Sequence, residues 1–316
     1  MTEFNAQHIP VLLKAVEEFA FPENGQVFAD ATFGLGGHTR AILAKYPGIR
    51  KVIAIDRDSE ILEHSCKSLD DPRISRFQAN ASDLAAILPL AREKAVDGIL
   101  VDLGVSSYQL ENPERGFSFS KPGPLDMRMN LDQVTTAADL VNSFERNELV
   151  KIFREFGEEK FSGRIADAVI RERQKEAITT TNRLAEIISG AIPAKFKAKS
   201  PIHPATRVFQ AIRIAVNNEL EELQTFLETA IKCLNPGGHL CVISFHSLED
   251  RIVKQFMQKH QKGCVCPPNF PVCRCGIVPD LELLTRKAVF ADEDEIAINP
   301  RSRSARLRAA RKCRES

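Results

Sequence analysis

The 316-residue chain contains no tryptophan and only two tyrosines, and it carries almost no net charge. Because 43 basic residues are offset by 42 acidic ones, the overall charge favours neither a nucleic acid nor an acidic protein as partner. The sequence also lacks any segment near the roughly 20 apolar residues of a membrane span. Its start does not resemble a signal peptide. We therefore expect a cytoplasmic protein without a membrane association.

Eight cysteines without a secretory signal indicate a reducing compartment, with free thiols or a bound metal. Two pairs, Cys264-x-Cys266 and Cys273-x-Cys275, could supply four thiolates to a tetrahedral zinc ion. The two-residue spacing of zinc knuckles is absent, and three prolines lie among the six residues between the pairs. Of these two alternatives, we expect free thiols in a surface loop and no metal site.

The most informative stretch runs from Val27 to Arg40. A short apolar strand ends at Asp30, a turn with three glycines follows, and a helix continues through 41–45. Glycines at such a turn let the backbone approach a ligand closely. A second apolar strand over 52–55 ends at Asp56, where an acid can bind both hydroxyls of a ribose. The pattern predicts a nucleoside-containing cofactor; the alternative is a glycine turn that only packs a helix against a strand.

Strands and helices alternate over the first third of the chain. Helices are expected at 59–69 and 84–93, and two more apolar strands at 74–78 and 98–101. This alternation is typical of a parallel sheet with helices on both faces, whose ligands bind beyond the carboxyl ends of the strands. Candidate ligand-binding residues follow all four strands, and we expect them to share one site: Asp30, Asp56, Asn80 with Ala81, and Asp102.

The alternation stops after Gln109. A segment rich in proline and glycine over 115–129 is expected to form an ordered loop. Four helices are expected to follow it, at 137–143, 145–156, 160–175 and 182–191. The predicted domains are therefore 1–110 with 203–316, which build the sheet, and the loop and helical insert 111–202.

The sheet domain is predicted to resume with one long helix over 207–234. This helix ends at the turn Asn235-Pro236-Gly237-Gly238. A strand over 239–245, a helix to 260 and a strand near 283–290 complete this domain. Residues 300–314 form an arginine-rich tail. This tail either pairs with the phosphates of an RNA backbone or is a solvated, disordered end.

The late helix, Asn-Pro-Gly-Gly turn and apolar strand resemble those of Class I S-adenosylmethionine-dependent methyltransferases. More closely, the chain from about residue 8 to 308 resembles the ribosomal RNA small subunit methyltransferase H family. The matching motifs are Asp30–His38, Ala54–Asp58, Asp97–Ser107, Glu114–Phe119, Gly123–Met129, His203–Arg207, Phe209–Arg213, Ile243–Arg251 and Asn299–Arg301. The resemblance implies an α/β fold with a Rossmann-like, doubly wound sheet. It also implies an inserted all-helical domain that recognises the substrate.

The resemblance assigns the cofactor, S-adenosylmethionine, to the glycine turn. Backbone N–H groups of Gly36, Gly37 and His38 would bind its methionine end, because a helix N-terminus favours a carboxylate. Asp56 would bind the ribose hydroxyls.

The resemblance also places Asp102 and Gln109 in the cofactor site. The family often has an aromatic residue near the adenine, whereas this chain has Ala81 at the aligned position. Asp102 is in addition the candidate catalytic residue, since it or a nearby carbonyl could accept a hydrogen bond from the attacking amino group. The alternative for Asp102 is a helix N-cap.

On the substrate side, the resemblance suggests five residues, and each has a structural alternative. For four of them the alternative is a loop-stabilising salt bridge: Asp126, Arg128, His203 and Arg207. For His246 it is a loop histidine that caps a helix.

The implied activity is methylation of the exocyclic amino group of one cytosine in small-subunit (16S) ribosomal RNA, as naked RNA or within the 30S particle. The protein would act as a monomer or homodimer. A nicotinamide dehydrogenase is one alternative, but Thr39 stands where its third glycine would be. A non-catalytic RNA-binding protein and a methyltransferase of DNA or protein are the others. Intact Gly36, Gly37, Asp56 and Asp102 favour an enzyme.

Overall fold

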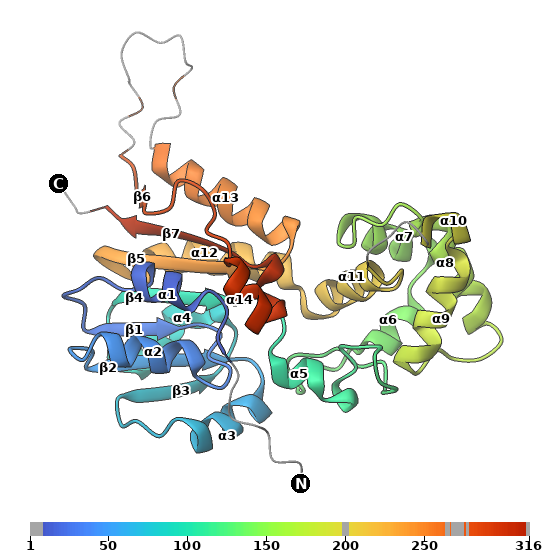
Figure 1. The fold of residues 1–316 in the computed structure, drawn as a ribbon, viewed down its shortest axis with the longest axis horizontal. Helices are drawn as coiled ribbons and strands as arrows, with labels where there is room; N and C mark the ends of the chain where they lie inside the picture. The colour runs from blue at the N-terminus through green and yellow to red at the C-terminus, as the bar shows by residue number, and fades with distance from the viewer. Residues whose placement is uncertain (1–8, 198–201, 263–265, 267–274, 276–277, 314–316) are drawn as a thin grey trace. The chain divides into compact units, whose positions relative to one another are not determined.

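The chain forms two compact units, residues 1–104 with 220–316 and residues 105–219. The computed structural model describes residues 9–197, 202–262, 266, 275 and 278–313 (Figure 1). The first unit resumes at Leu220, later than the predicted return of the sheet domain at 203. The boundary differs because helix α11 (Thr206–Asn217) buries Phe209 and Ile212 in the core of the second unit.

The first unit is built on a seven-stranded sheet in the order β3-β2-β1-β4-β5-β7-β6. The five parallel strands are β1 (Val27–Asp30), β2 (Lys51–Asp56), β3 (Ile74–Gln78), β4 (Val96–Asp102) and β5 (Leu234–Ser244). In register, Ala29 of β1 lies between Ile53 of β2 and Ile99 of β4. Antiparallel strands β7 (Arg306–Lys312) and β6 (Leu281–Leu283) complete the sheet beyond β5 (Figure 1). The prediction of a doubly wound α/β sheet is confirmed.

Helices cover both faces of this sheet because alternate strand residues point to opposite sides. Phe28 and Leu100 pack with α1 (Leu13–Phe19) and α2 (Gly37–Lys45). Ala29 and Ile99 pack on the other face with α4 (Leu84–Leu90), α12 (Glu219–Cys233) and α13 (Ser247–Lys262). The remaining helices of the unit are α3 (Ser59–Ser68) and α14 (Glu293–Ile298). Along the described residues, no helix has the length and apolar character needed to cross a membrane.

The second unit contains only helices as regular elements within residues 105–197 and 202–219. They are α5 (Ser107–Glu111), α6 (Ala137–Ser143), α7 (Arg146–Glu155), α8 (Ser162–Arg173), α9 (Thr181–Ala191), α10 (Ala194–Lys197) and α11. Their apolar stripes form one core around Leu140, Phe153 and Ile165. This confirms an inserted helical domain.

Two local predictions, of a helix and of a strand, were wrong, and one of the two alternatives for the tail is excluded. The single helix expected over 207–234 is two helices, because Asn218 adopts a left-handed conformation with φ of 50° and ends α11. The arginine-rich tail is not a solvated end over 306–312, where it forms β7. Leu307 and Ala309 are buried at alternate positions of this strand, and its guanidinium groups find acidic partners. The strand expected at 283–290 is reduced to β6 and a bridge from Val289 to Leu307.

Of the four cysteines in the two Cys-x-Cys pairs, Cys264 and Cys273 lie outside the described residues.

Candidate active site

The site lies where the order of the strands reverses. From β1 the chain runs outward through β2 and β3, then crosses back to β4 on the other side of β1 and continues to β5. Ligands of open α/β sheets bind at this switch, beyond the carboxyl ends of the strands. Asp30 ends β1 and Asp102 ends β4, so both acids stand at the switch.

The glycine turn after β1 shapes one wall of the site. Gly36 caps α2 in a left-handed conformation, with φ of 78°. A Cβ atom there would lie 2.9 Å from the side chains of both Phe33 and Leu69, so only glycine fits. The N–H groups in the first turn of α2 have no acceptor within their own helix, which makes this end a site for an anion. The turn is thus suited to the carboxylate predicted for it.

Asp56, at the end of β2, is held by two backbone amides. Gly34 N–H donates to one carboxylate oxygen at 2.8 Å, and Asp58 N–H donates to the other at 3.0 Å. Burial raises the pKa of Asp56 despite these two bonds. A carboxylate has about four lone-pair positions, so each oxygen can still accept one bond from a ribose hydroxyl.

Asp30 and Asp102 are linked through Thr32, whose N–H donates to Asp30 Oδ1 at 3.4 Å and whose Oγ1 accepts the backbone N–H of Asp102 at 2.6 Å. Thr39 Oγ1 donates to Asp30 Oδ2 at 2.7 Å. Burial raises the pKa of Asp30 to about 6, and the charge of Asp56 adds to the shift. These bonds fix the ends of β1 and β4 against each other.

Asp102 is the most strongly perturbed acid of the site. Burial, followed by the charges of Asp30 and Glu249, raises its pKa well above the usual value. Among the described residues, its Oδ1 atom has no hydrogen-bond partner although it is buried. Such a cluster of acids favours a positively charged ligand, because a cation relieves both the burial cost and the mutual repulsion.

His38, in the first turn of α2, lies beside Asp102. Its Nε2 atom is 2.9 Å from the carbonyl oxygen of Val11, and its Nδ1 atom is 3.8 Å from Asp102 Oδ2. The ring is 9% exposed. The side chain therefore connects the N-terminal segment to the acid at the end of β4, in addition to the backbone role predicted for this residue.

Two further predicted residues of the first unit are engaged locally. Ala81 begins a 3-10 helix after β3 and packs against the apolar core. Its methyl group cannot stack on an adenine as the aromatic residue of the family would. His246 Nδ1 accepts the N–H of Glu249 at 3.4 Å, and its Nε2 lies 3.1 Å from Glu249 Oε1. Glu249 in turn accepts the N–H groups of Phe245 and His246. This geometry fits a histidine at the start of α13 that stabilises the helix end.

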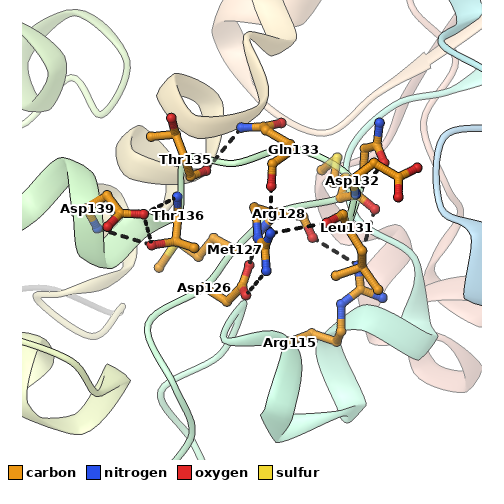
Figure 2. A network of polar contacts seen from close by, with 12 residues as sticks. Arg115, Asp126, Met127, Arg128, Leu131, Asp132, Gln133, Thr135, Thr136 and Asp139 are labelled. Carbon is orange, nitrogen blue, oxygen red and sulfur yellow. Dashed lines mark hydrogen bonds and ion pairs between the residues drawn. The ribbon is translucent and has the colours of Figure 1, made fainter.

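The other predicted residues belong to the second unit. Gln109 closes a capping box with Ser106 at the start of α5. Figure 2 shows Arg128 pointing at Asp126, with which it forms two bonds of 2.8 Å. Arg128 also donates to the carbonyl groups of Leu131 and Gln133. The pair has the geometry of a brace within the loop.

His203 and Arg207 are exposed, and the salt bridge predicted as an alternative for each is not among their described contacts. The His203 ring is exposed and packs against Phe119, with 4.7 Å between ring centroids. Arg207 is exposed and makes one long bond of 3.4 Å, to the carbonyl oxygen of Glu158.

Sequence reasoning gave no role to Thr32, Thr39 or Glu249. Thr39 carried a usable signal, since it stands at the position of the third glycine of a dinucleotide turn, one helical turn into α2. A hydroxyl there faces the acid that ends β1. Glu249 gave no local signal because its charge acts on Asp102 only in the folded sheet.

The strand order, the glycine turn at the end of β1 and the acid at the end of β2 define a Class I S-adenosylmethionine-dependent methyltransferase. The chain belongs to the MraW methylase family, whose model matches residues 5–313. It is similar along its length to proteins called ribosomal RNA small subunit methyltransferase H. The relative from Desulforapulum autotrophicum is 48% identical over 306 residues, which cover 96% of this chain and 98% of the relative.

Two other relatives with the same name are similar to this chain over nearly the same length. The one from Syntrophotalea carbinolica is 48% identical over 314 residues, covering 99% of this chain and 100% of the relative. The one from Carboxydothermus hydrogenoformans is 46% identical over 308 residues, covering 96% and 97%. The residues present fit the cofactor of this class: the α2 N-terminus suits a carboxylate, Asp56 suits ribose hydroxyls, and the acid cluster around Asp102 suits a cation.

Proposed function

We propose that this protein transfers a methyl group from S-adenosylmethionine to the exocyclic amino nitrogen of a cytosine in small-subunit (16S) ribosomal RNA. The support is the similarity to proteins named ribosomal RNA small subunit methyltransferase H, which are 46–48% identical over 96–99% of this chain. The acid at the end of β4, with its buried and unpartnered Oδ1 among the described residues, supplies the group this reaction needs.

The binding roles are divided among three strand ends. The N–H groups of Gly37 and His38 bind the methionine carboxylate, whereas Gly36, predicted to share this role, donates its N–H to the Phe33 carbonyl and shapes the turn. Asp56 binds the ribose, and Asp102 with Asp30 offsets the positive charge. Bound S-adenosylmethionine supplies a methyl group that the sulfonium already activates. Ala81 is the proposed neighbour of the adenine, without an aromatic ring to stack on it, and Gln109 is a further proposed cofactor ligand.

Asp102 is the proposed catalytic residue. The lone pair of an exocyclic amine is delocalised into the cytosine ring, so the amine is a weak nucleophile. A carboxylate oxygen that accepts one N–H of this amine raises the electron density on nitrogen and fixes its direction. Alignment and charge placement of this kind are the main contributions a protein can make to such a transfer.

The helical unit, predicted as residues 111–202 and found as 105–219, is the proposed substrate-recognition domain. His203 offers an exposed ring for stacking on a base, and Arg207 offers an exposed guanidinium for a phosphate. Asp126 and Arg128 act by holding the loop that carries them. His246 acts by capping α13.

The proposed partner is small-subunit ribosomal RNA within the 30S particle, and the proposed location is the cytoplasm. The protein acts there as a monomer or homodimer. Comparing methyl transfer to purified 30S subunits with transfer to naked ribosomal RNA tests which form of the RNA is the substrate. Analytical sedimentation measures the oligomeric state.

The experiment for the active site separates binding from transfer. Wild type and Asp102→Asn would be tested for cofactor binding by calorimetry and for methyl transfer to 30S subunits with labelled cofactor. We expect Asp102→Asn to bind with reduced affinity and to lose at least about 100-fold in transfer at saturating cofactor, since a neutral amide is a poorer acceptor. Undiminished transfer at saturation would reduce Asp102 to a cofactor ligand.

A further inference from the structure

The His38 ring has a defined hydrogen position. Its Nε2 atom lies 2.9 Å from the carbonyl oxygen of Val11, and a carbonyl can only accept. Nε2 therefore carries a hydrogen in every charge state of the ring, and in the neutral ring Nδ1 carries a lone pair. That Nδ1 faces Asp102 Oδ2 at 3.8 Å. A lone pair beside a half-buried carboxylate is unfavourable, whereas one proton on Nδ1 or on the Oδ2 that faces it makes the contact attractive.

Among the described residues, the charges that shift the pKa of Asp102 are those of two acids, Asp30 and Glu249. Asp30 faces it from β1, Glu249 from α13 and the Cys241 thiol from β5, while His38 faces it from α2. Burial raises the pKa of the Cys241 thiol far above its usual value, so the thiol stays neutral. Because the charges of Asp30 and Glu249 both raise the pKa of Asp102, ionisation of all three acids is unfavourable without a cation.

We propose that His38 and Asp102 share one proton in the free protein, release it when the cofactor binds, and take up the proton that the amine loses during methylation. This inference rests on the proposed function. Asp102 is the group that meets the amine, and His38 is a positioning residue that acts through Asp102.

The step balances in atoms and charge. An N–C bond forms with the lone pair of the amine, and the S–C bond breaks with its electron pair going to sulfur. One N–H bond of the amine breaks, its electron pair stays on nitrogen, and the proton passes to the Asp102 carboxylate. It is then held where Asp102 Oδ2 faces His38 Nδ1. The pocket loses the positive charge of the sulfonium and gains a proton, so its net charge is unchanged. One positive charge therefore still balances the acids Asp30, Asp102 and Glu249.

Proton release on cofactor binding tests the first half without any RNA. Calorimetry at pH 7 in buffers of different ionisation enthalpy counts the protons released. S-adenosylmethionine should release about one proton from wild type. S-adenosylhomocysteine, which differs by the missing methyl group and sulfonium charge, should release markedly less. Equal release by the two ligands would overturn the proposal.

His38→Gln is the matched variant, because its amide N–H can still donate to Val11 while it offers no titrating nitrogen. Release at pH 7 should fall, and its midpoint should move to lower pH, since Asp102 then holds the proton alone. Single-turnover transfer should show the same movement of its acidic limb. An unchanged proton count and pH profile in His38→Gln would overturn the role of His38.

If His38→Gln fails to fold, the wild-type ring still decides the matter. Nitrogen NMR of His38 should show Nε2 protonated with or without ligand, and an Nδ1 signal that changes when S-adenosylmethionine binds at pH 7. An unchanged Nδ1 signal would refute proton sharing. A failure of the proposed function would appear separately, as normal proton release without methylated RNA.

Discussion

Replacement of Asp30 by asparagine should stabilise the protein in a pH-dependent way. Burial raises the pKa of Asp30 from 3.8 to about 6 in the folded state. At about 1.4 kcal/mol for each pKa unit, ionising this group costs the folded state about 3 kcal/mol once the pH exceeds both values. At about pH 3 and below the carboxyl is largely protonated in both states, and the cost nearly disappears. The stability of wild type relative to Asp30→Asn should therefore fall by about 3 kcal/mol between pH 3 and pH 8.

Urea unfolding of both proteins across this pH range measures the difference. Asparagine keeps an acceptor for the Thr32 N–H and can donate to the Thr39 hydroxyl, so the local geometry is retained. Asp71→Asn is the control with opposite sign, since Arg73 lowers the pKa of Asp71 to about 2. That variant should lose a little stability at pH 8 and less as the pH approaches 2. A constant difference between wild type and Asp30→Asn from pH 3 to pH 8 would refute the argument.

Three further predictions concern the glycine turn, the ribose acid and the tail. Gly36→Ala should lose about 2–4 kcal/mol of stability in urea unfolding, from the left-handed backbone and the crowded Cβ, whereas Gly48→Ala, with nothing within 4 Å, should change little. Asp56→Ala should weaken cofactor binding about 10- to 100-fold in calorimetry while the melting curve stays cooperative; unchanged affinity would contradict its ribose role. Deletion of 300–316 should abolish cooperative unfolding of the first unit, because β7 lies between β5 and β6, and a stable truncated protein would disprove this.

The sheet and the acids at its edge were predictable because their signals are local. Short apolar runs that end on Asp30, Asp56 and Asp102 mark parallel strands wherever the chain then turns into a helix. The glycine turn predicted the cofactor edge for the same reason. What these patterns could not give is the mutual arrangement of the acids, which raises the pKa of Asp102 through charges from β1 and α13.

The arginine-rich tail shows why some elements could not be predicted from the sequence. Leu307 and Ala309 alternate with arginines, and that spacing is typical of a strand only if the arginines find partners. Arg308 Nε lies 2.7 Å from Asp250 on α13, and Arg306 contacts the same carboxylate at 3.4 Å. Asp250 is more than 50 residues away in the chain, so no local pattern links it to the tail.

The most direct test of the account is the identity of the methylated nucleoside. The purified protein would be incubated with labelled S-adenosylmethionine and 30S subunits, and the RNA would be digested and analysed by mass spectrometry. We predict label in cytidine methylated on its exocyclic nitrogen, and at least about 100-fold less with Asp102→Asn at saturating cofactor. Label in another nucleoside, at a ring carbon of cytosine or only in protein would contradict it.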